Sequence, residues 1–89
     1  MITSKDFIKT CKHEVYKYAE AKLDKTDDVE FNEEDDVYVV WYCKSLQNHK
    51  ALISTNLHDG MYYELTYNGD KNELYFDAYK KFEHKCIPL

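Results

Sequence analysis

The sequence predicts an α+β fold of two layers, in which a three-stranded antiparallel sheet carries an N-terminal and a C-terminal helix on one face. Three observations predict it. Apolar residues recur at helical spacing over residues 4–23, they do so again over 71–86, and residues 37–67 hold three runs rich in β-branched and aromatic side chains. A chain of 89 residues is short enough to form a single domain around one core.

The first helix is predicted over residues 4–23. Ser4 is a suitable N-cap, and Asp6 lies where a negative charge stabilises the first turn. One side of this helix is apolar and is expected to cover the sheet. That side consists of Phe7, Ile8, Cys11, Val15, Tyr18, Ala19 and Leu23.

Residues 24–36 form a connector rich in Asp and Glu. Val29 and Phe31 alternate with charged residues, so a short fourth strand at the edge of the sheet stays open as an alternative. Three main strands are predicted at 37–43, 51–55 and 61–67. Their short connections favour an antiparallel meander in chain order.

Side-chain alternation along the strands predicts which residues face the helices. On the first strand, the residues expected beneath the helices are Val37, Val39, Trp41 and Cys43. The opposite face is expected to be open, with Tyr38, Val40 and Tyr42 from the first strand and Tyr62, Glu64 and Thr66 from the third.

Residues 71–86 are predicted to form the second helix. Asp70 and Glu73 have the spacing of a capping box, and Pro88 follows as a stop. The apolar stripe of this helix consists of Leu74, Tyr75, Ala78, Tyr79, Phe82 and Cys86. Read as a strand, residues 74–79 alternate poorly between apolar and polar side chains, so the helix is favoured.

The open face is the first candidate site, and we expect it to bind a protein partner. The chain has 9 Tyr, a residue that combines a large apolar area with a polar tip and few rotors and therefore suits recognition surfaces. The predicted contact residues are Tyr38, Tyr42, Tyr62 and Glu64. The alternative is that these side chains only complete a sheet that lacks a second helical layer.

The acidic connector is the second candidate site. A ridge of carboxylates attracts a basic protein, and it can take the place of phosphates on an enzyme that handles nucleic acid. The predicted contact residues are Asp27, Asp28, Glu30, Glu33, Glu34, Asp35 and Asp36. The alternative is an ordinary solvated loop.

Charge and composition argue against several classes of protein. Asp and Glu number 17 against 12 basic residues, all of them Lys, which disfavours direct binding of nucleic acid. No apolar run approaches the roughly 20 residues that cross a bilayer, and the first residues are too polar for a signal peptide. We therefore expect no membrane partner and a cytoplasmic location. The cysteines also favour this location, because they number 3, an odd count, and are too widely spaced to indicate a disulfide framework.

The residue pairs Cys11 with His13 and His84 with Cys86 raise the question of a zinc site. Two residues that are two apart on a helix point in different directions, so they do not converge on one tetrahedral metal. Buried, inert thiols are the favoured interpretation of Cys11 and Cys86.

Two further groups of residues are interpreted as turns. Asn68, Asp70 and Asn72 have the spacing that opens a calcium loop, but the Gly and Glu that such a loop needs further on are missing. His58 and Asp59 could act as acid and base, but no nucleophile or phosphate-binding loop accompanies them. We expect no metal, no cofactor and no enzymatic activity.

Four segments between residues 36 and 81 carry a resemblance to known proteins. They are residues 36–41, 46–52, 59–71 and 77–81. In these segments the chain resembles a group of small uncharacterised proteins encoded by phages and prophages of Gram-positive bacteria. The resemblance implies an accessory protein that acts in the cytoplasm of an infected cell, and it implies no catalytic residue.

The expected function is that of a non-enzymatic phage accessory protein. Such a protein would bind and inhibit or modulate a host or phage protein, for example a nucleic-acid-handling enzyme or a defence nuclease, through its acidic and tyrosine-rich surface. The alternatives are a self-associating homodimer, formed through the bare face or edge of the sheet, and a direct nucleic-acid binder.

Overall fold

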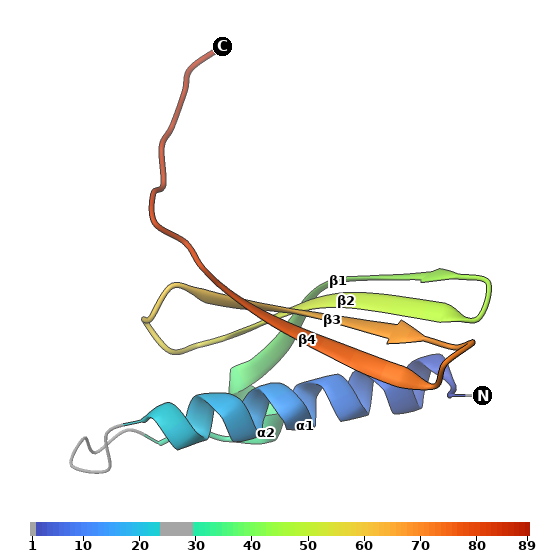
Figure 1. Cartoon of the computed structure of the whole chain (residues 1–89). Helices are drawn as coiled ribbons and strands as arrows, with labels where there is room; N and C mark the ends of the chain where they lie inside the picture. The colour runs from blue at the N-terminus through green and yellow to red at the C-terminus, as the bar shows by residue number, and fades with distance from the viewer. Residues whose placement is uncertain (1, 24–29) are drawn as a thin grey trace.

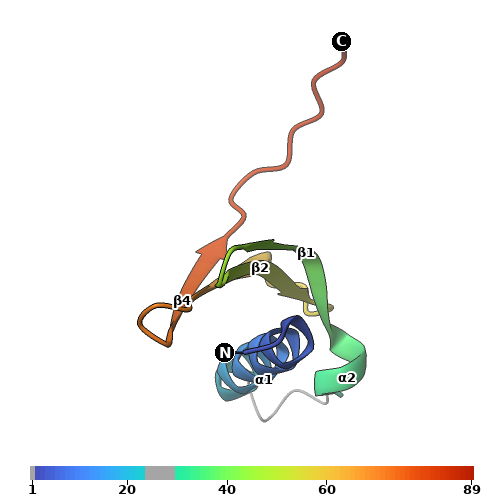
Figure 2. The same ribbon diagram turned by 90° about the vertical axis from the view of Figure 1, so that its right-hand side faces the viewer.

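A computed structural model describes residues 2–23 and 30–89, and in them one long helix lies against a four-stranded antiparallel sheet. The elements are α1 (Ser4–Lys22), α2 (Glu33–Asp36), β1 (Val37–Ser45), β2 (Asn48–Thr55), β3 (Met61–Asn68) and β4 (Glu73–Lys80). The strands are neighbours in chain order, and the sheet curves around α1 (Figures 1 and 2). The predicted α+β class and the antiparallel meander are therefore confirmed.

The first helix forms almost where it was predicted, but Thr3 and not Ser4 is its N-cap. The Asp6 amide donates a hydrogen bond of 3.1 Å to the Thr3 hydroxyl, and the Phe7 amide donates one of 2.8 Å to the Thr3 carbonyl. The first of these bonds satisfies an amide that the first turn of a helix leaves without a partner, and the second is the first regular backbone bond of the helix. The Ser4 side chain is thereby free to contact the sheet.

The hydrophobic core lies between α1 and the sheet. One stripe of α1 is buried, with Phe7, Cys11, Val15 and Ala19 spaced four residues apart. The sheet contributes Val37, Ala51, Ile53, Tyr63, Leu65 and Tyr67. Burial of each large apolar side chain stabilises the fold by about 1.5–3 kcal/mol relative to exposure.

The prediction of a second helix over residues 71–86 is wrong. Residues 73–80 form strand β4, which pairs with β3 from Met61 opposite Lys80 to Asn68 opposite Glu73, and residues 81–89 have no regular structure. The β4 side chains do alternate, with Leu74 and Phe76 half-buried on the side of α1 and Tyr75 exposed on the other. Because aromatic residues occupy both faces, the hydrophobicity pattern alone hides this alternation.

The fourth strand is thus not the one left open in the acidic connector. Phe31 is not in a strand, and its ring stacks on that of Tyr16 with the centroids 5.3 Å apart. The short helix α2 follows it. Val29 lies outside the described residues.

A β-bulge in β1 changes which of its residues face the helix. Val39 lies opposite Ile53 and Trp41 lies opposite Leu52, so Val40 is an extra residue in the ladder. Beyond the bulge the alternation is inverted. The prediction that Trp41 and Cys43 lie beneath the helices and Tyr42 on the open face is therefore wrong.

Candidate functional site

The sheet surface that faces away from α1 is the candidate site, and we call it the open face. The ladders align its residues in three rows. The first row is Tyr38, Ser54, Tyr62 and Tyr79, the second is Trp41, Leu52, Glu64 and Asp77, and the third is Cys43, Lys50, Thr66 and Tyr75. The alternate residues of each strand face α1, and those of the two central strands are buried except for the half-buried Met61.

Aromatic rings on the open face are exposed. The exposed fractions are 44% for Tyr38, 41% for Trp41, 42% for Tyr75 and 52% for Tyr79. These rings stand on the two outer strands, and the half-buried Tyr62 lies between them. No part of the described chain packs over this side of the sheet, as Figure 2 shows.

The charged residues of the open face lie in its middle. Glu64 is directly opposite Asp77, and two like charges in such a pair repel. The Lys50 Nζ atom lies 3.4 Å from a Glu64 carboxylate oxygen and offsets part of this repulsion. The result is an acidic centre bordered by aromatic rings.

A shallow hollow adjoins the first row of the open face. It has a volume of about 210 Å³, and Tyr38, His58, Tyr62 and Lys81 contribute to its lining. Asp59, beside His58, accepts a hydrogen bond of 3.1 Å from the Met61 amide, as expected of a turn residue. The open face is therefore not flat at this end, and a side chain of a partner can enter the hollow.

Of the four open-face contact residues predicted from the sequence, the structure places three on it and one elsewhere. Tyr38, Tyr62 and Glu64 lie on the open face, whereas Tyr42 lies on the side of α1. Sequence reasoning missed Trp41, and it also missed Tyr75, Asp77 and Tyr79. The alternation of Leu74, Phe76 and Ala78 was the available signal for β4.

Tyr42 ties the helix to the sheet. Its hydroxyl donates to the Ser4 hydroxyl at 2.7 Å and lies 2.6 Å from Nδ1 of His49. This contact is the hydrogen bond of the His49 ring, and which of the two groups donates depends on the His49 tautomer. His49 is 1% exposed, and this Nε2 has no hydrogen-bond partner among the described residues.

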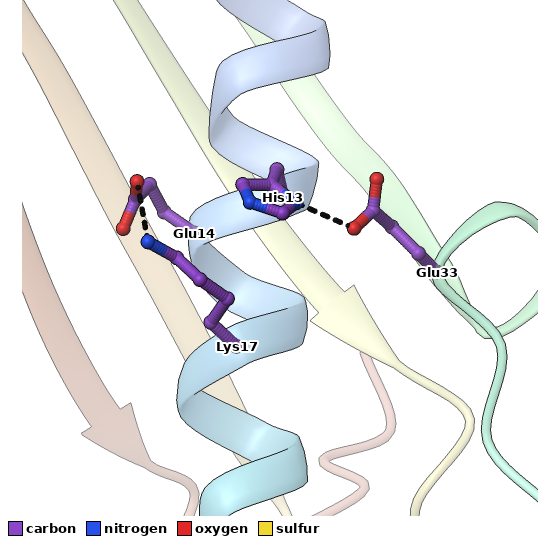
Figure 3. Close-up of polar contacts among 4 residues, drawn as sticks. All are labelled: His13, Glu14, Lys17 and Glu33. Atoms are coloured by element: carbon purple, nitrogen blue, oxygen red, sulfur yellow. Dashed lines mark hydrogen bonds and ion pairs between the residues drawn. The ribbon is translucent and has the colours of Figure 1, made fainter.

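The acidic residues that precede β1 are partly used within the molecule. Glu33 contacts Nδ1 of His13 on α1 at 2.7 Å (Figure 3). Asp36 accepts hydrogen bonds from the Asn32 amide at 2.8 Å and the Asn56 side chain at 3.2 Å. The bond from Asn32, followed by that from Asn56, lowers the pKa of Asp36.

The other acidic candidates have varied positions. Glu30, Glu34 and Asp35 are exposed, while Asp27 and Asp28 lie outside the described residues. Glu34 and Glu33 border a pocket of about 320 Å³ whose opposite wall is formed by α1 with Lys5, Ile8, Lys9 and Lys12. Part of the acidic charge therefore faces lysines of the same chain.

The residues considered for calcium form the β3–β4 turn. The Asn68 side chain accepts hydrogen bonds from the amides of Asp70 and Lys71 at 3.0 and 3.3 Å. Asn72 accepts one of 2.7 Å from the Tyr67 hydroxyl. Their polar atoms thus stabilise the turn.

The thiols differ in their surroundings. Cys11 is buried, and desolvation, followed by the charge of Glu14, raises its pKa to about 12. Cys43 and Cys86 are exposed, so the prediction of a buried Cys86 is wrong. In the part of the chain that the structure describes, no three His, Cys, Asp or Glu side chains are grouped as metal ligands would be.

Within the described ranges, neither helix has the length and apolar character needed to cross a membrane.

Comparison with protein families gives a match over most of the chain. The profile of a family of unknown function (DUF6275) matches residues 8–89. No curated protein and no solved structure matches the chain.

Proposed function

Because the chain belongs to the DUF6275 family of unknown function, we propose its function from the geometry of the structure. The protein is a non-enzymatic module that binds another protein through the open face. The observation that carries this proposal is the exposure of Tyr38, Trp41, Tyr75 and Tyr79 on one side of a sheet. Tyr and Trp are enriched at protein interfaces, and exposed apolar patches on a small domain often mark binding sites.

The charge of the open face favours a protein over a nucleic acid. Its basic residue, Lys50, is already engaged by Glu64, and Asp77 adds a second carboxylate. Aromatic sheets that stack on bases need cationic residues for the phosphates, and this chain has a net charge of −5. The partner that fits offers apolar surface to the rings and an Arg or Lys to the two carboxylates.

A narrower form of the proposal is an accessory protein encoded by a phage, which acts in the host cytoplasm. There it would inhibit or modulate a nucleic-acid-handling or defence enzyme of host or phage. Two features support it: the resemblance to small phage and prophage proteins, and the exposed carboxylates of Glu30, Glu34 and Asp35, which precede β1 in the chain. A basic nucleic-acid-binding surface would attract both these carboxylates and the acidic centre of the open face.

The test compares three forms of the full chain as baits in a lysate. They are the wild type, an open-face variant with Trp41→Ser and Tyr79→Ser, and the control Leu46→Ser. Leu46 is 83% exposed in the β1–β2 turn, so the control removes an apolar side chain that is not on the open face. We expect the wild type and the control to retain the same protein, and the open-face variant to retain it at least about tenfold more weakly, because aromatic anchors dominate binding energy.

Two further measurements make the result decisive. Thermal unfolding of all three forms establishes that each is folded. The isosteric pair Glu64→Gln and Asp77→Asn is expected to reduce the salt dependence of binding, because it removes the two carboxylates and leaves the rings. The proposal is overturned if the wild type retains no saturable partner, or if the folded open-face variant binds as well as the wild type.

A further inference from the structure

Strand β4 leaves one edge of the sheet free. In the order β1-β2-β3-β4, both outer strands have an edge that no other described residue pairs with. The edge of β1 is interrupted by the bulge at Val40, a common protection against edge-to-edge pairing. In contrast, β4 pairs with β3 over eight residues without a register shift, so its free edge is long and regular.

The amides of β4 are available at this edge. The Lys81 amide donates to the Gly60 carbonyl at 2.8 Å, so the backbone of Lys81 faces β3. Backbone groups alternate in direction along an antiparallel strand. The amides of Leu74, Phe76, Ala78 and Lys80 therefore face the free edge.

The layer of α1 does not extend fully over β4. A helix is about 10–12 Å wide and strands lie about 4.8 Å apart, so one helix covers two to three strands. Between α1 and β4 is a groove of about 540 Å³, lined by Glu14, Lys17, Tyr18, Leu74 and Phe76. Apolar side chains of β4 thus border open space beside an unpaired strand edge.

Residues 81–89 continue from β4 as an extended segment, which we call the tail. Every residue of the tail is exposed, including Phe82 at 92% and Ile87 at 68%. Figure 1 shows the tail leaving the sheet and projecting away from the body of the molecule. Its apolar side chains have no packing partner in the described chain.

The tail is poorly suited to fold back on its own strand. Such a hairpin needs a tight turn immediately after β4, where Gly, Asn, Asp or Pro are the usual residues. The sequence there is Lys81-Phe82-Glu83-His84, and the bond from Lys81 to Gly60 holds the chain in the direction of the strand. A second molecule is therefore the better acceptor for the tail.

From the free edge of β4 and the unpartnered tail, we infer that two copies of this chain form a dimer by exchanging residues 81–89. Each tail adds as an antiparallel strand to the free edge of β4 in the other copy, which closes a two-fold symmetric assembly. A register that places Ile87 opposite Tyr75 also places Lys85 opposite Asp77, a pair of opposite charges. The two-fold axis then passes beside Lys81, whose side chain is exposed to solvent.

The test measures the mass of the full chain by light scattering across micromolar concentrations. We expect twice the 10.7 kDa of one chain. Ile87→Asp should raise the dissociation constant of the dimer at least about tenfold, because a charge replaces the apolar side chain that pairs with the Tyr75 ring in this register. Leu46→Asp is the matched control, since it places the same charge at an exposed Leu outside the interface, and it should dimerise like the wild type.

A backbone variant tests strand addition directly. Ala78→Pro removes an amide that faces the free edge and leaves the β3 side of the ladder intact, so it should give a folded monomer. The inference is overturned if the wild type is a monomer at every concentration. It is equally overturned if the dimer survives both Ile87→Asp and Ala78→Pro but is lost in Trp41→Asp, because the open face would then be the interface. Ile87→Asp and Ala78→Pro change no residue of the open face, so the proposed function can fail or hold independently.

Discussion

The side-chain hydroxyl of Tyr42 is hydrogen-bonded to residues of two other elements. Its hydroxyl reaches Ser4 on α1 and His49 on β2, and its ring lies 5.9 Å from that of Phe7. Because Nε2 of His49 has no partner among the described residues, the bond at Nδ1 is the one that satisfies the buried ring. The Tyr42 hydroxyl thus joins helix, edge strand and core.

We expect Tyr42→Phe to lower the free energy of unfolding by about 1–3 kcal/mol, because it leaves Nδ1 of the buried His49 ring without its hydrogen-bond partner in either tautomer. Urea denaturation measures the change. Tyr38→Phe is the matched control, since it removes the same hydroxyl from an exposed ring on the same strand, and it should change stability by less than about 0.5 kcal/mol. Equal effects of the two substitutions would contradict this role of Tyr42.

The buried thiol of Cys11 and the buried phenol of Tyr63 predict that the protein loses stability at alkaline pH. Burial raises the pKa of Cys11 from 9.0 to about 12 and that of Tyr63 from 10.0 to about 12. Since both pKa values are higher in the folded state, the stability they contribute is complete below pH 9 and is lost as the pH rises toward 12.

We therefore expect the free energy of unfolding to fall between those pH values, by up to about 1.4 kcal/mol per pH unit for each group. Chemical denaturation at a series of pH values measures the slope. Cys11→Val removes one of the two groups, so its slope above pH 9 should be shallower than that of the wild type. A stability that is constant with pH in this range would be inconsistent with burial of the thiol.

At the scale of elements, the helix and strands whose apolar residues follow a clear local pattern could be predicted from the sequence. Helix α1 and strands β1, β2 and β3 were found within a few residues, because each has a regular apolar pattern. Strand β4 was misassigned, because Tyr75 and Tyr79 on its exposed face imitate a helical stripe. The bulge at Val40 left no sign in the pattern, so the side on which Trp41 and Tyr42 lie could not be predicted.

The turn before β4 gives an element-scale prediction. A methyl group at Gly69 would overlap the backbone carbonyl of Gln47 in the neighbouring β1–β2 turn, and the Gly69 amide donates to the Asn48 side chain at 2.9 Å. Gln47 and Asp70 are also hydrogen-bonded between the two turns. We expect Gly69→Ala to destabilise the protein by about 1–3 kcal/mol, because a backbone atom cannot move aside cheaply.

Leu46, in the other turn, should respond in the opposite direction. Its φ of 55° is a left-handed conformation that costs a residue with a side chain about 1–2 kcal/mol. Leu46→Gly should therefore raise the free energy of unfolding, and thermal unfolding of both variants measures the two signs. If Gly69→Ala were as stable as the wild type, the close packing of the two turns would be refuted.

At the scale of the whole molecule, the predicted open face depended on the coverage of the sheet. Tyr38, Tyr62 and Glu64 were placed on it from the sequence because they precede the bulge or stand on a regular strand. The groove beside β4 and the tail could not be predicted, since both exist because residues 71–86 do not form the helix that the sequence pattern favours. Two separate surfaces result, an aromatic face and a strand edge.

Trp41 distinguishes the two surfaces in one measurement. The chain has 1 Trp, so its fluorescence reports on this position alone. The side chain is 41% exposed and lies on the open face, away from the free edge of β4. Its fluorescence should be quenched by acrylamide in the free protein, and the quenching should stay the same across the concentrations at which the mass doubles, because tail exchange leaves the open face uncovered. Binding of a protein partner should shift the emission to shorter wavelength and protect the ring from acrylamide, since an interface excludes water from such anchors. Protection that accompanies dimerisation would mean that the open face itself pairs, and a bound partner that leaves the quenching unchanged would place that partner on another surface.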